Sequence, residues 1–300
     1  MSGGLAGTIS STLTSPLEVV KTQLQSSAGS SKSPLGIAKG ILEQDGITGF
    51  WRGLPPTLVG IIPARSIYFY SYQTSKEYLE SKDIKGTANS LLAGLAAGIA
   101  ANSATNPIWM VKTRMQLTAS SPASAGYSGY GPAIRTIYRE EGLKGFYRGV
   151  TASYWGASEG MVQFVVYEKI KTALLQKQSD ARKEAKLPEI GTLPKSQYFL
   201  AAGFSKAIAT VSTYPHEVAR TRMRELSVNG VYKYSGMIGT LSVIAKEEGR
   251  RGLYGGMGTH VARVVPNSAV MFLVYETARQ WIGAREARRN EREGGKGGKK

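Results

Sequence analysis

The stretch Pro16-Leu-Glu-Val-Val-Lys21 occurs three times in this chain of 300 residues. It returns as Pro107-Ile-Trp-Met-Val-Lys112 and as Pro215-His-Glu-Val-Ala-Arg220. Each copy follows a helix-like stretch rich in small residues. A motif that recurs at wide and near-constant spacing is typical of an internal repeat, so the fold is best analysed in repeated units.

Two further motifs follow each copy in the same order. An acid-glycine pair leads into an aromatic-glycine segment, as in Asp45-Gly46 before Phe50-Trp-Arg-Gly53. The other copies are Glu141-Gly142 with Phe146-Tyr-Arg-Gly149 and Glu248-Gly249 with Leu253-Tyr-Gly-Gly256. A last motif occurs as Tyr72-Gln-Thr-Ser-Lys76, Tyr167-Glu-Lys-Ile-Lys171 and Tyr275-Glu-Thr-Ala-Arg279. Three motifs in one order define three equivalent repeats.

Each repeat has the pattern of a long helix, a loop, a short amphipathic helix and a second long helix. We predict long helices over residues 2–25, 56–80, 87–116, 149–176, 195–224 and 257–283. The repeats then cover residues 1–80, 87–176 and 195–283, and a basic, disordered tail covers 284–300. The predicted fold class is an all-α membrane protein with six transmembrane helices in three pseudo-symmetric pairs.

Composition limits the function classes that fit. The chain has 38 Lys and Arg against 21 Asp and Glu, a formal net charge of +17, which indicates an anionic partner. Its mean hydropathy of −0.19 is that of a soluble protein. A transmembrane helix beside a water-filled cavity, however, needs apolar residues only where it meets lipid or a neighbouring helix.

An enzyme is not expected. The chain has no cysteine, which excludes a disulfide framework and thiolate metal ligands. It has only two histidines, far apart in the sequence, so a metal cluster built on histidine is not expected. No nucleophile-base pair and no glycine-rich phosphate loop occurs in the sequence. A nucleic-acid-binding protein remains a remote alternative, because it explains the charge but not the repeated prolines.

These motifs resemble the signature of the mitochondrial carrier family over essentially the whole chain. The resemblance implies a multi-pass transporter of the mitochondrial inner membrane that works as a monomer without a cofactor. Several segments are similar to the pyrimidine nucleotide carrier branch, which implies UTP, CTP, TTP or their di- and monophosphates as substrates. These segments are 106–116, 149–159, Ser205-Lys206 and 214–222. Carriers of NAD, FAD or folate stay an alternative, because they share a tryptophan at the position of Trp109.

The resemblance implies that the acid of each proline motif pairs with the base of the next repeat and closes the matrix side. Trp109 replaces one acid, so at most two such bridges are expected. Glutamines are expected to brace this gate. The residues assigned to the matrix gate are Glu18, Lys21, Gln25, Trp109, Lys112, Gln116, Glu217 and Arg220.

A second, cytoplasmic gate is expected from the last motif of each repeat. Gln73 replaces an acid there and offers only a neutral hydrogen bond, which is weaker than a charge-assisted one. This gate therefore also has at most two bridges. Its residues are Gln73, Lys76, Glu168, Lys171, Glu276 and Arg279.

The substrate site is expected between the two gates, where the resemblance implies Gly60, Trp155 and Arg263 as contact positions. The planar guanidinium of Arg263 suits a phosphate, and Lys206 and Arg65 are further candidate ligands. Gly156 is expected to leave room for a flat base that stacks on Trp155 and donates to Glu159. Asn267 completes this set. An intramolecular ion pair of Arg65 or Glu159 and a lipid-facing Trp155 remain open alternatives.

The aromatic-glycine segments begin the even-numbered helices, and backbone donors at a helix start suit a lipid phosphate. The resemblance implies cardiolipin as a structural lipid. Gly255 replaces the base in the third repeat, so the charge support is expected to be weaker there. The cardiolipin residues are Trp51, Arg52, Gly53, Tyr147, Arg148, Gly149, Tyr254, Gly255 and Gly256.

Overall fold

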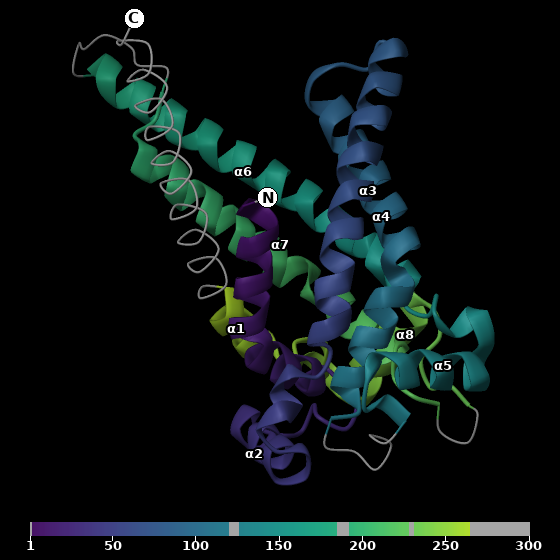
Figure 1. Ribbon diagram of the computed structural model, residues 1–300. Coiled ribbons are helices and arrows are strands. Elements are labelled where there is room, and N and C mark those ends of the chain that lie inside the picture. The colour runs from purple at the N-terminus through teal and green to yellow at the C-terminus, as the bar shows by residue number, and fades with distance from the viewer. Residues whose placement is uncertain (1, 120–125, 185–191, 228–230, 265–300) are drawn as a thin grey trace, which may run out of the picture. The chain divides into compact units, whose positions relative to one another are not determined.

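The structure is a computed structural model that describes residues 2–119, 126–184, 192–227 and 231–264. These residues form helices joined by loops (Figure 1). Among them, no helix has both the length and the apolar character needed to cross a membrane.

The predicted helices are present over nearly the expected ranges. The first repeat contains α1 (Ser2–Leu24), α2 (Pro34–Asp45), η1 (Ile47–Trp51) and α3 (Leu54–Ser81). The second contains α4 (Gly86–Leu117), α5 (Tyr130–Gly145) and α6 (Val150–Glu184). The third contains α7 (Lys195–Met223), α8 (Met237–Glu247) and α9 (Gly249–Leu253), followed by helical residues 257–264.

The largest difference lies at the end of α6, which continues to Glu184 instead of ending at 176. Residues 177–184 contain neither glycine nor proline, so nothing in the local sequence stops the helix. The predicted helix 257–283 is described only as far as 264. The rest of that helix, with Asn267, Glu276 and Arg279, and the tail 284–300 lie outside the described residues.

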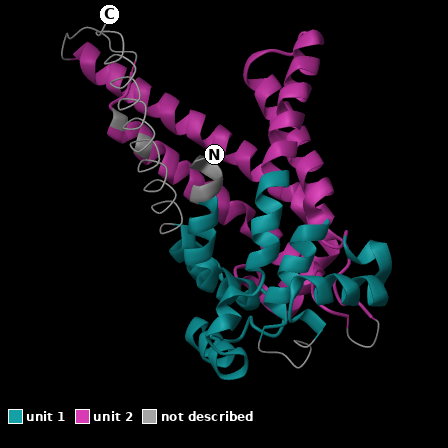
Figure 2. Ribbon diagram, in the orientation of Figure 1, with its two compact units in different colours: residues 1–63, 107–146, 256–300 teal, residues 64–106, 147–255 magenta. Residues whose placement is uncertain are grey.

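The chain forms two compact units, which Figure 2 shows in different colours. Unit 1 consists of residues 1–63, 107–146 and 256–300, and unit 2 of residues 64–106 and 147–255. Each unit therefore takes segments from all three repeats. Contacts within a unit consequently join residues that are far apart in the sequence.

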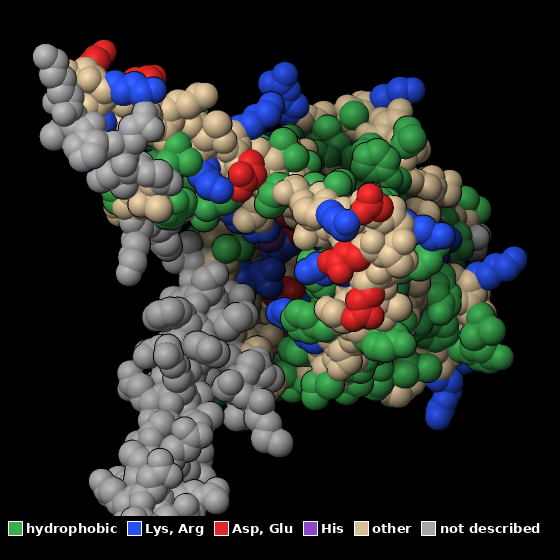
Figure 3. Space-filling view, turned by 90° about the horizontal axis from the view of Figure 1, so that it is seen from above, with side chains coloured by type: hydrophobic (Ala, Val, Ile, Leu, Met, Phe, Trp, Pro, Cys, Tyr) green, Lys and Arg blue, Asp and Glu red, His purple; other side chains and the backbone are tan. Residues whose placement is uncertain are grey.

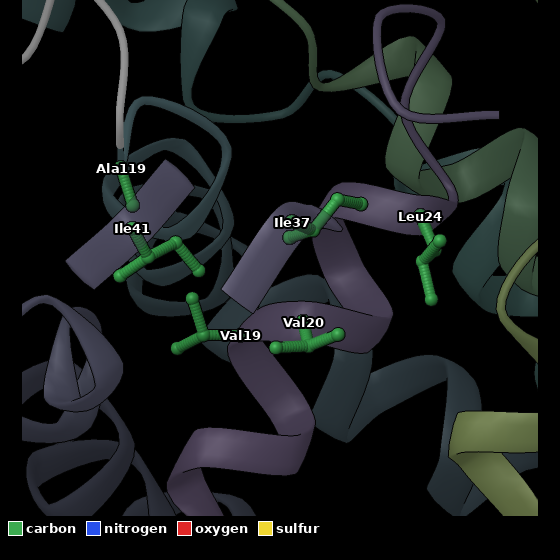
Figure 4. Close-up of a cluster of buried hydrophobic side chains, with 6 residues drawn as sticks. All are labelled: Val19, Val20, Leu24, Ile37, Ile41 and Ala119. Atoms are coloured by element: carbon green, nitrogen blue, oxygen red, sulfur yellow. The ribbon is translucent and has the colours of Figure 1, made fainter. Parts of the chain in front are cut away.

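A buried apolar cluster fixes the end of α1 to α2 in unit 1. It consists of Val19, Val20, Leu24, Ile37, Ile41 and Ala119 (Figure 4). Ile37 and Ile41 are one helical turn apart on α2, whereas Leu35 and Leu42 of the same helix are exposed. Burial of each aliphatic side chain contributes about 1.5–3 kcal/mol. The cluster therefore holds the segment that carries Glu18 and Lys21.

The start and end of α2 follow from local sequence. The Ser33 hydroxyl accepts a hydrogen bond from the Gly36 amide at 3.1 Å, and Pro34 takes the first helical position. The helix stops before Gly46, whose φ of +67° is in the left-handed region that favours glycine.

Candidate functional site

Glu18 lies at the centre of a charged cluster in unit 1. Its Oε1 atom accepts a hydrogen bond from Lys112 Nζ at 2.8 Å and from Arg263 Nη1 at 3.3 Å. Glu18 comes from α1 and Lys112 from α4, and Arg263 belongs to the helical residues after α9. The structure thus brings together one acid and one base of the expected matrix gate. It also adds Arg263, which we had assigned to the substrate site.

This Glu18 cluster has more positive than negative charge, because one carboxylate serves two cations. All three side chains are largely shielded from solvent, with exposed fractions of 13–22%. The Arg263 Nε atom is buried and makes no hydrogen bond with any described residue. Arg263 therefore has both a displaceable partner and a spare donor.

Trp109 occupies the position of the missing acid and packs beside the Glu18 cluster. The Lys112 ammonium lies 5.3 Å from the centre of the Trp109 ring, within the range of a cation–π contact. Gly60 of α3 is buried against the same ring, where an added Cβ would lie 3.2 Å from Trp109 Cη2. Gly60, which we expected at a substrate contact position, therefore allows α3 to approach α4.

Gln116, one of the glutamines expected to brace the matrix gate, links α4 to α1. The Thr22 hydroxyl donates to Gln116 Oε1 at 2.9 Å, and Gln23 Nε2 donates to the Gln116 carbonyl at 3.3 Å. Lys21 and Gln25 are buried in the same region. These contacts join the first and second repeats directly after their gate bases.

Four of the other gate charges lie in ion pairs within single helices. Glu217 and Arg220 of α7 lie 3.7 Å apart, and Glu168 and Lys171 of α6 lie 3.3 Å apart. Residues three apart share one face of a helix, so such pairs form locally. The pairing between repeats expected at the cytoplasmic gate involves Glu276 and Arg279, which lie outside the described residues, so that pairing stays a prediction.

Gln73, which replaces an acid at this gate, makes a hydrogen bond on its own helix. Its Nε2 atom donates to Glu77 Oε1 of α3 at 2.7 Å, one turn along the same helix. Glu276 and Arg279, the remaining residues expected at this gate, lie outside the described residues. Among the described residues of this gate, Gln73, Glu168 and Lys171 are thus held by neighbours on their own helices.

Two proposed substrate ligands bind each other in unit 2. The Lys206 ammonium donates to Glu159 Oε1 at 2.8 Å, and the Thr210 hydroxyl donates to the same atom at 3.0 Å. Glu159 therefore forms the intramolecular ion pair that we had left open, but with Lys206. Arg65 is exposed on α3. The Lys206 side chain is half exposed, so this ion pair is weak.

The space at Gly156 is filled by protein. An added Cβ would lie 2.9 Å from His216 Nε2, so the glycine accommodates the imidazole ring of His216. That ring is held in place by a hydrogen bond between its Nδ1 atom and the Thr213 carbonyl. The expectation that Gly156 leaves room for a base is therefore wrong. The neighbouring Trp155 remains 55% exposed.

Trp51 and Arg52, which we assigned to cardiolipin, make contacts within unit 1. Pro16 has no amide hydrogen to donate to the Thr12 carbonyl, and the Trp51 indole donates to that oxygen at 3.0 Å. Arg52 donates to Asp45 Oδ1 at 2.7 Å and to the Thr118 carbonyl at 3.4 Å. Trp51 thus satisfies a carbonyl inside α1 that Pro16 leaves without a backbone donor, and Arg52 satisfies a carbonyl at the end of α4.

Arg148 behaves in the same way in unit 2. It donates to the carbonyls of Met223 and Tyr234 at 3.3 Å and 3.1 Å. Its guanidinium also lies over the Tyr232 ring, 3.3 Å from the ring centre. Arg52 and Arg148 therefore bind protein groups. The groups that remain for a lipid phosphate in the aromatic-glycine segments are backbone N–H donors.

The glycine that ends each of these segments touches the next repeat. Its φ is positive in all three copies, and an added Cβ would meet the carbonyl oxygen of a gate base at 3.0–3.2 Å. The three pairs are Gly53 with Lys112, Gly149 with Arg220 and Gly256 with Lys21. Only glycine combines this backbone conformation with so close an approach. Each pair lies within one unit and joins successive repeats.

We expect Gly149→Ala to destabilise the protein by about 1–3 kcal/mol, because φ is +75° and the Cβ would lie 3.2 Å from the Arg220 oxygen. The unfolding temperature of the detergent-solubilised protein measures this. Gly239→Ala on α8 is the matched control, since nothing lies within 4 Å of its added Cβ. The control should be neutral or more stable than wild type, and equal effects of both variants would contradict the packing role.

Sequence reasoning missed two buried arginines, each two residues after a gate base. Arg222 Nη2 donates to Glu248 Oε2 at 2.7 Å, and Arg114 Nη2 lies 2.6 Å from Glu141 Oε1. Both arginine side chains are fully buried. The acid-glycine motifs thus supply their partners. The sequence did contain a signal for these arginines, because an arginine stands two residues after the gate base in the second and third repeats. In the first repeat Gln23 takes this position.

The model for "mitochondrial carrier protein" matches residues 1–83, 85–178 and 191–286. The chain belongs to the mitochondrial carrier family. Solute carrier family 25 member 36-A of Danio rerio is 42% identical over 299 residues, which cover 91% of this carrier and 94% of that protein.

Two further relatives carry names that state what they transport. The mitochondrial pyrimidine nucleotide transporter RIM2 of Saccharomyces cerevisiae is 35% identical over 314 residues, or 92% of this carrier and 83% of RIM2. Nicotinamide adenine dinucleotide transporter 2, mitochondrial, of Arabidopsis thaliana is 34% identical over 285 residues, or 91% of this carrier and 76% of that protein.

Family membership settles the predicted class. It confirms the fold class, an all-α membrane protein with six transmembrane helices in three two-helix repeats. It also confirms the location in the mitochondrial inner membrane. This carrier is not an enzyme, because the proteins of the family are transporters.

Proposed function

We propose that this carrier exchanges pyrimidine nucleotides across the inner membrane by alternating access. Its segments 106–116 and 149–159 resemble the pyrimidine nucleotide branch, and a relative of 35% identity is named as such a transporter. An NAD carrier is the second candidate, because a relative of 34% identity is named as an NAD transporter.

The observation that best supports an anionic substrate is that Lys112 and Arg263 share the carboxylate of Glu18. Two cations on one carboxylate leave positive charge for a phosphate. The buried Arg263 Nε atom adds a donor with no partner among the described residues. A guanidinium binds phosphate in a planar, bidentate manner that Glu18, through its single hydrogen bond of 3.3 Å, does not match.

This arrangement couples substrate binding to the matrix gate. A phosphate that takes Arg263 leaves Glu18 with Lys112 alone, so one tie between α1 and the residues after α9 is lost. A ligand shifts a conformational equilibrium only through different affinities for the two states. Here the difference arises because Arg263 is engaged by Glu18 in one state and by phosphate in the other.

We further propose that the carrier acts as a monomer and binds cardiolipin as a structural lipid. The backbone amides at the starts of α3 and α6 support lipid binding, because a helix start offers unpaired donors. Arg52 and Arg148 are engaged with protein groups, so this proposal now rests on the backbone.

The substrate is tested by ligand-induced stabilisation and uptake. At a ligand concentration about 100 times the dissociation constant, UTP, CTP or TTP should stabilise the detergent-solubilised carrier by about 2.7 kcal/mol. Proteoliposomes loaded with one of these nucleotides should take up labelled UTP. NAD is the comparison ligand, and a response to NAD with none to the pyrimidine nucleotides would replace our proposal with the second candidate.

A further inference from the structure

A cavity of about 690 Å³ lies within unit 2. It is lined by residues of α3, α4 and α6. Cavities that hold small ligands range from about 300 to 1,000 Å³, so this volume fits a nucleotide. The cavity is distinct from the proposed substrate site, because Glu18, Lys112 and Arg263 all belong to unit 1.

The α3 wall of the cavity carries a row of side chains one turn apart: Tyr68, Tyr72, Lys76 and Glu80. The rings of Tyr68 and Tyr72 are nearly parallel, with an interplanar angle of 14° and centroids 6.3 Å apart. Aromatic faces of this kind stack with the bases of single nucleotides. Lys76 follows one turn later and supplies a cation.

Residues of α4 and α6 form the other walls, which combine glycines with the apolar side chains of Leu91, Leu95, Met161 and Phe164. Glycines of α4 and α6 line the cavity, among them Gly94 and Gly160. A Cβ added at Gly160 would have no atom within 4 Å, so the space beside it is open. At Gly98 the two helices meet, since an added Cβ would lie 2.9 Å from Ala157 Cβ. The α6 wall of the cavity therefore leaves open space beside Gly160.

We propose that this tyrosine cavity is a nucleotide subsite at the cytoplasmic end of the carrier, in which the base lies against Tyr68 and Tyr72 and Lys76 binds phosphate. The identity of the nucleotide in this subsite rests on the proposed function. Lys76 and Glu80 place one cation and one acid at the end of the cavity nearest the α3–α4 loop. The acid disfavours phosphate there, so the subsite binds more weakly than the cluster around Arg263.

The charged side chains of the described residues do not form one continuous positive patch on the surface seen in Figure 3. On the face seen in Figure 3, Lys and Arg side chains of the described residues alternate with Asp, Glu and apolar side chains. Scattered charge of this kind does not make a nucleotide site, which needs a shaped cavity with a cation, and the stacked tyrosines with Lys76 provide one.

The first test uses the absence of cysteine from the sequence. Ser90 is exposed and lines the cavity, so a thiol reagent should modify the S90C variant. UTP near ten times its dissociation constant should slow this modification about tenfold, in proportion to the free fraction. The protection should persist in the S90C/R263A double variant, in which the ligand proposed for the main site is removed.

The controls distinguish UTP bound in the subsite from a general effect of UTP on thiol reactivity and from lipid in the cavity. S235C, in the loop before α8, should show no protection by UTP. In the S90C/R263A double variant, E80Q should give protection at lower UTP concentration, because it removes a like charge next to Lys76. Protection by added phospholipid but not by UTP would assign the cavity to lipid and overturn the proposal, as would loss of all protection with R263A.

The second test fills the cavity. G160L should raise the KM for UTP uptake about fivefold or more with little change in kcat, because binding is lost before the transport step. G203L on α7 is the matched control, since its added Cβ also has no atom within 4 Å and it lies outside the lining. Wild-type KM in G160L would contradict the subsite. A wild-type carrier that takes up no pyrimidine nucleotide would instead contradict the proposed function.

Discussion

Arg263→Ala is expected to lower the uptake of UTP into nucleotide-loaded proteoliposomes by about 10- to 100-fold. Hydrogen bonds to charged groups contribute about 1.5–3 kcal/mol, and each 1.4 kcal/mol is a factor of ten in affinity. The variant loses the guanidinium that Glu18 holds at 3.3 Å and that we propose is handed to the phosphate. Initial uptake rates at equal protein content measure the effect.

Two further variants show whether the loss is specific. Arg263→Lys keeps the charge but not the planar fork, so its uptake should lie between wild type and alanine. Arg251→Ala removes an exposed arginine of α9 and should leave uptake unchanged. If Arg263→Ala transports UTP like wild type, Arg263 does not bind the substrate and our assignment is wrong.

Glu248→Gln is expected to destabilise the folded carrier by about 3 kcal/mol, which lowers the unfolding temperature by roughly 10 °C. Glu248 Oε2 accepts from Arg222 Nη2 at 2.7 Å, and the arginine side chain is fully buried. Glu248→Gln removes the nearest carboxylate, and the buried guanidinium keeps the more distant Glu225 Oε1, which lies 3.9 Å from Arg222 Nε. Thermal unfolding of the solubilised carrier, followed by fluorescence, measures the change.

Comparison with an exposed pair separates burial from charge. Lys39 and Glu43 of α2 lie 3.7 Å apart with exposed fractions of 78% and 62%, so Glu43→Gln should cost at most about 0.5 kcal/mol. The double variant R222M/E248L should be more stable than either single change, because it removes both charges together. Equal losses in Glu248→Gln and Glu43→Gln would contradict the buried ion pair.

The sequence predicted the helices well because their determinants are local. Apolar periodicity, the capping residue Ser33 and the glycine at 46 act within a few residues of the element that they define. The threefold repetition of the motifs gave the order of the helices. The same spacing predicted that Glu18 and Lys112 meet, since equivalent residues of successive repeats lie at equivalent positions.

The side-chain contacts were predicted less well, because each depends on how closely two helices that are distant in the sequence pack together. Sequence reasoning left an ion pair open for Glu159, and the structure places Lys206 beside it at 2.8 Å. The space at Gly156 is occupied by His216, which lies 60 residues further along the chain. Neither residue is identified by a motif, because the contact depends on how α6 and α7 pack.

The repeat, the order of helices and the positions of the gate charges were determined by the sequence alone, because motif spacing and helical periodicity are properties of the chain. Only the tertiary structure decided that Arg263 joins Glu18, that Trp51 serves the Thr12 carbonyl and that Gly53 touches the Lys112 carbonyl. These contacts join residues of different segments within one unit. Such contacts form only when folding brings the donors and acceptors within hydrogen-bonding or packing distance.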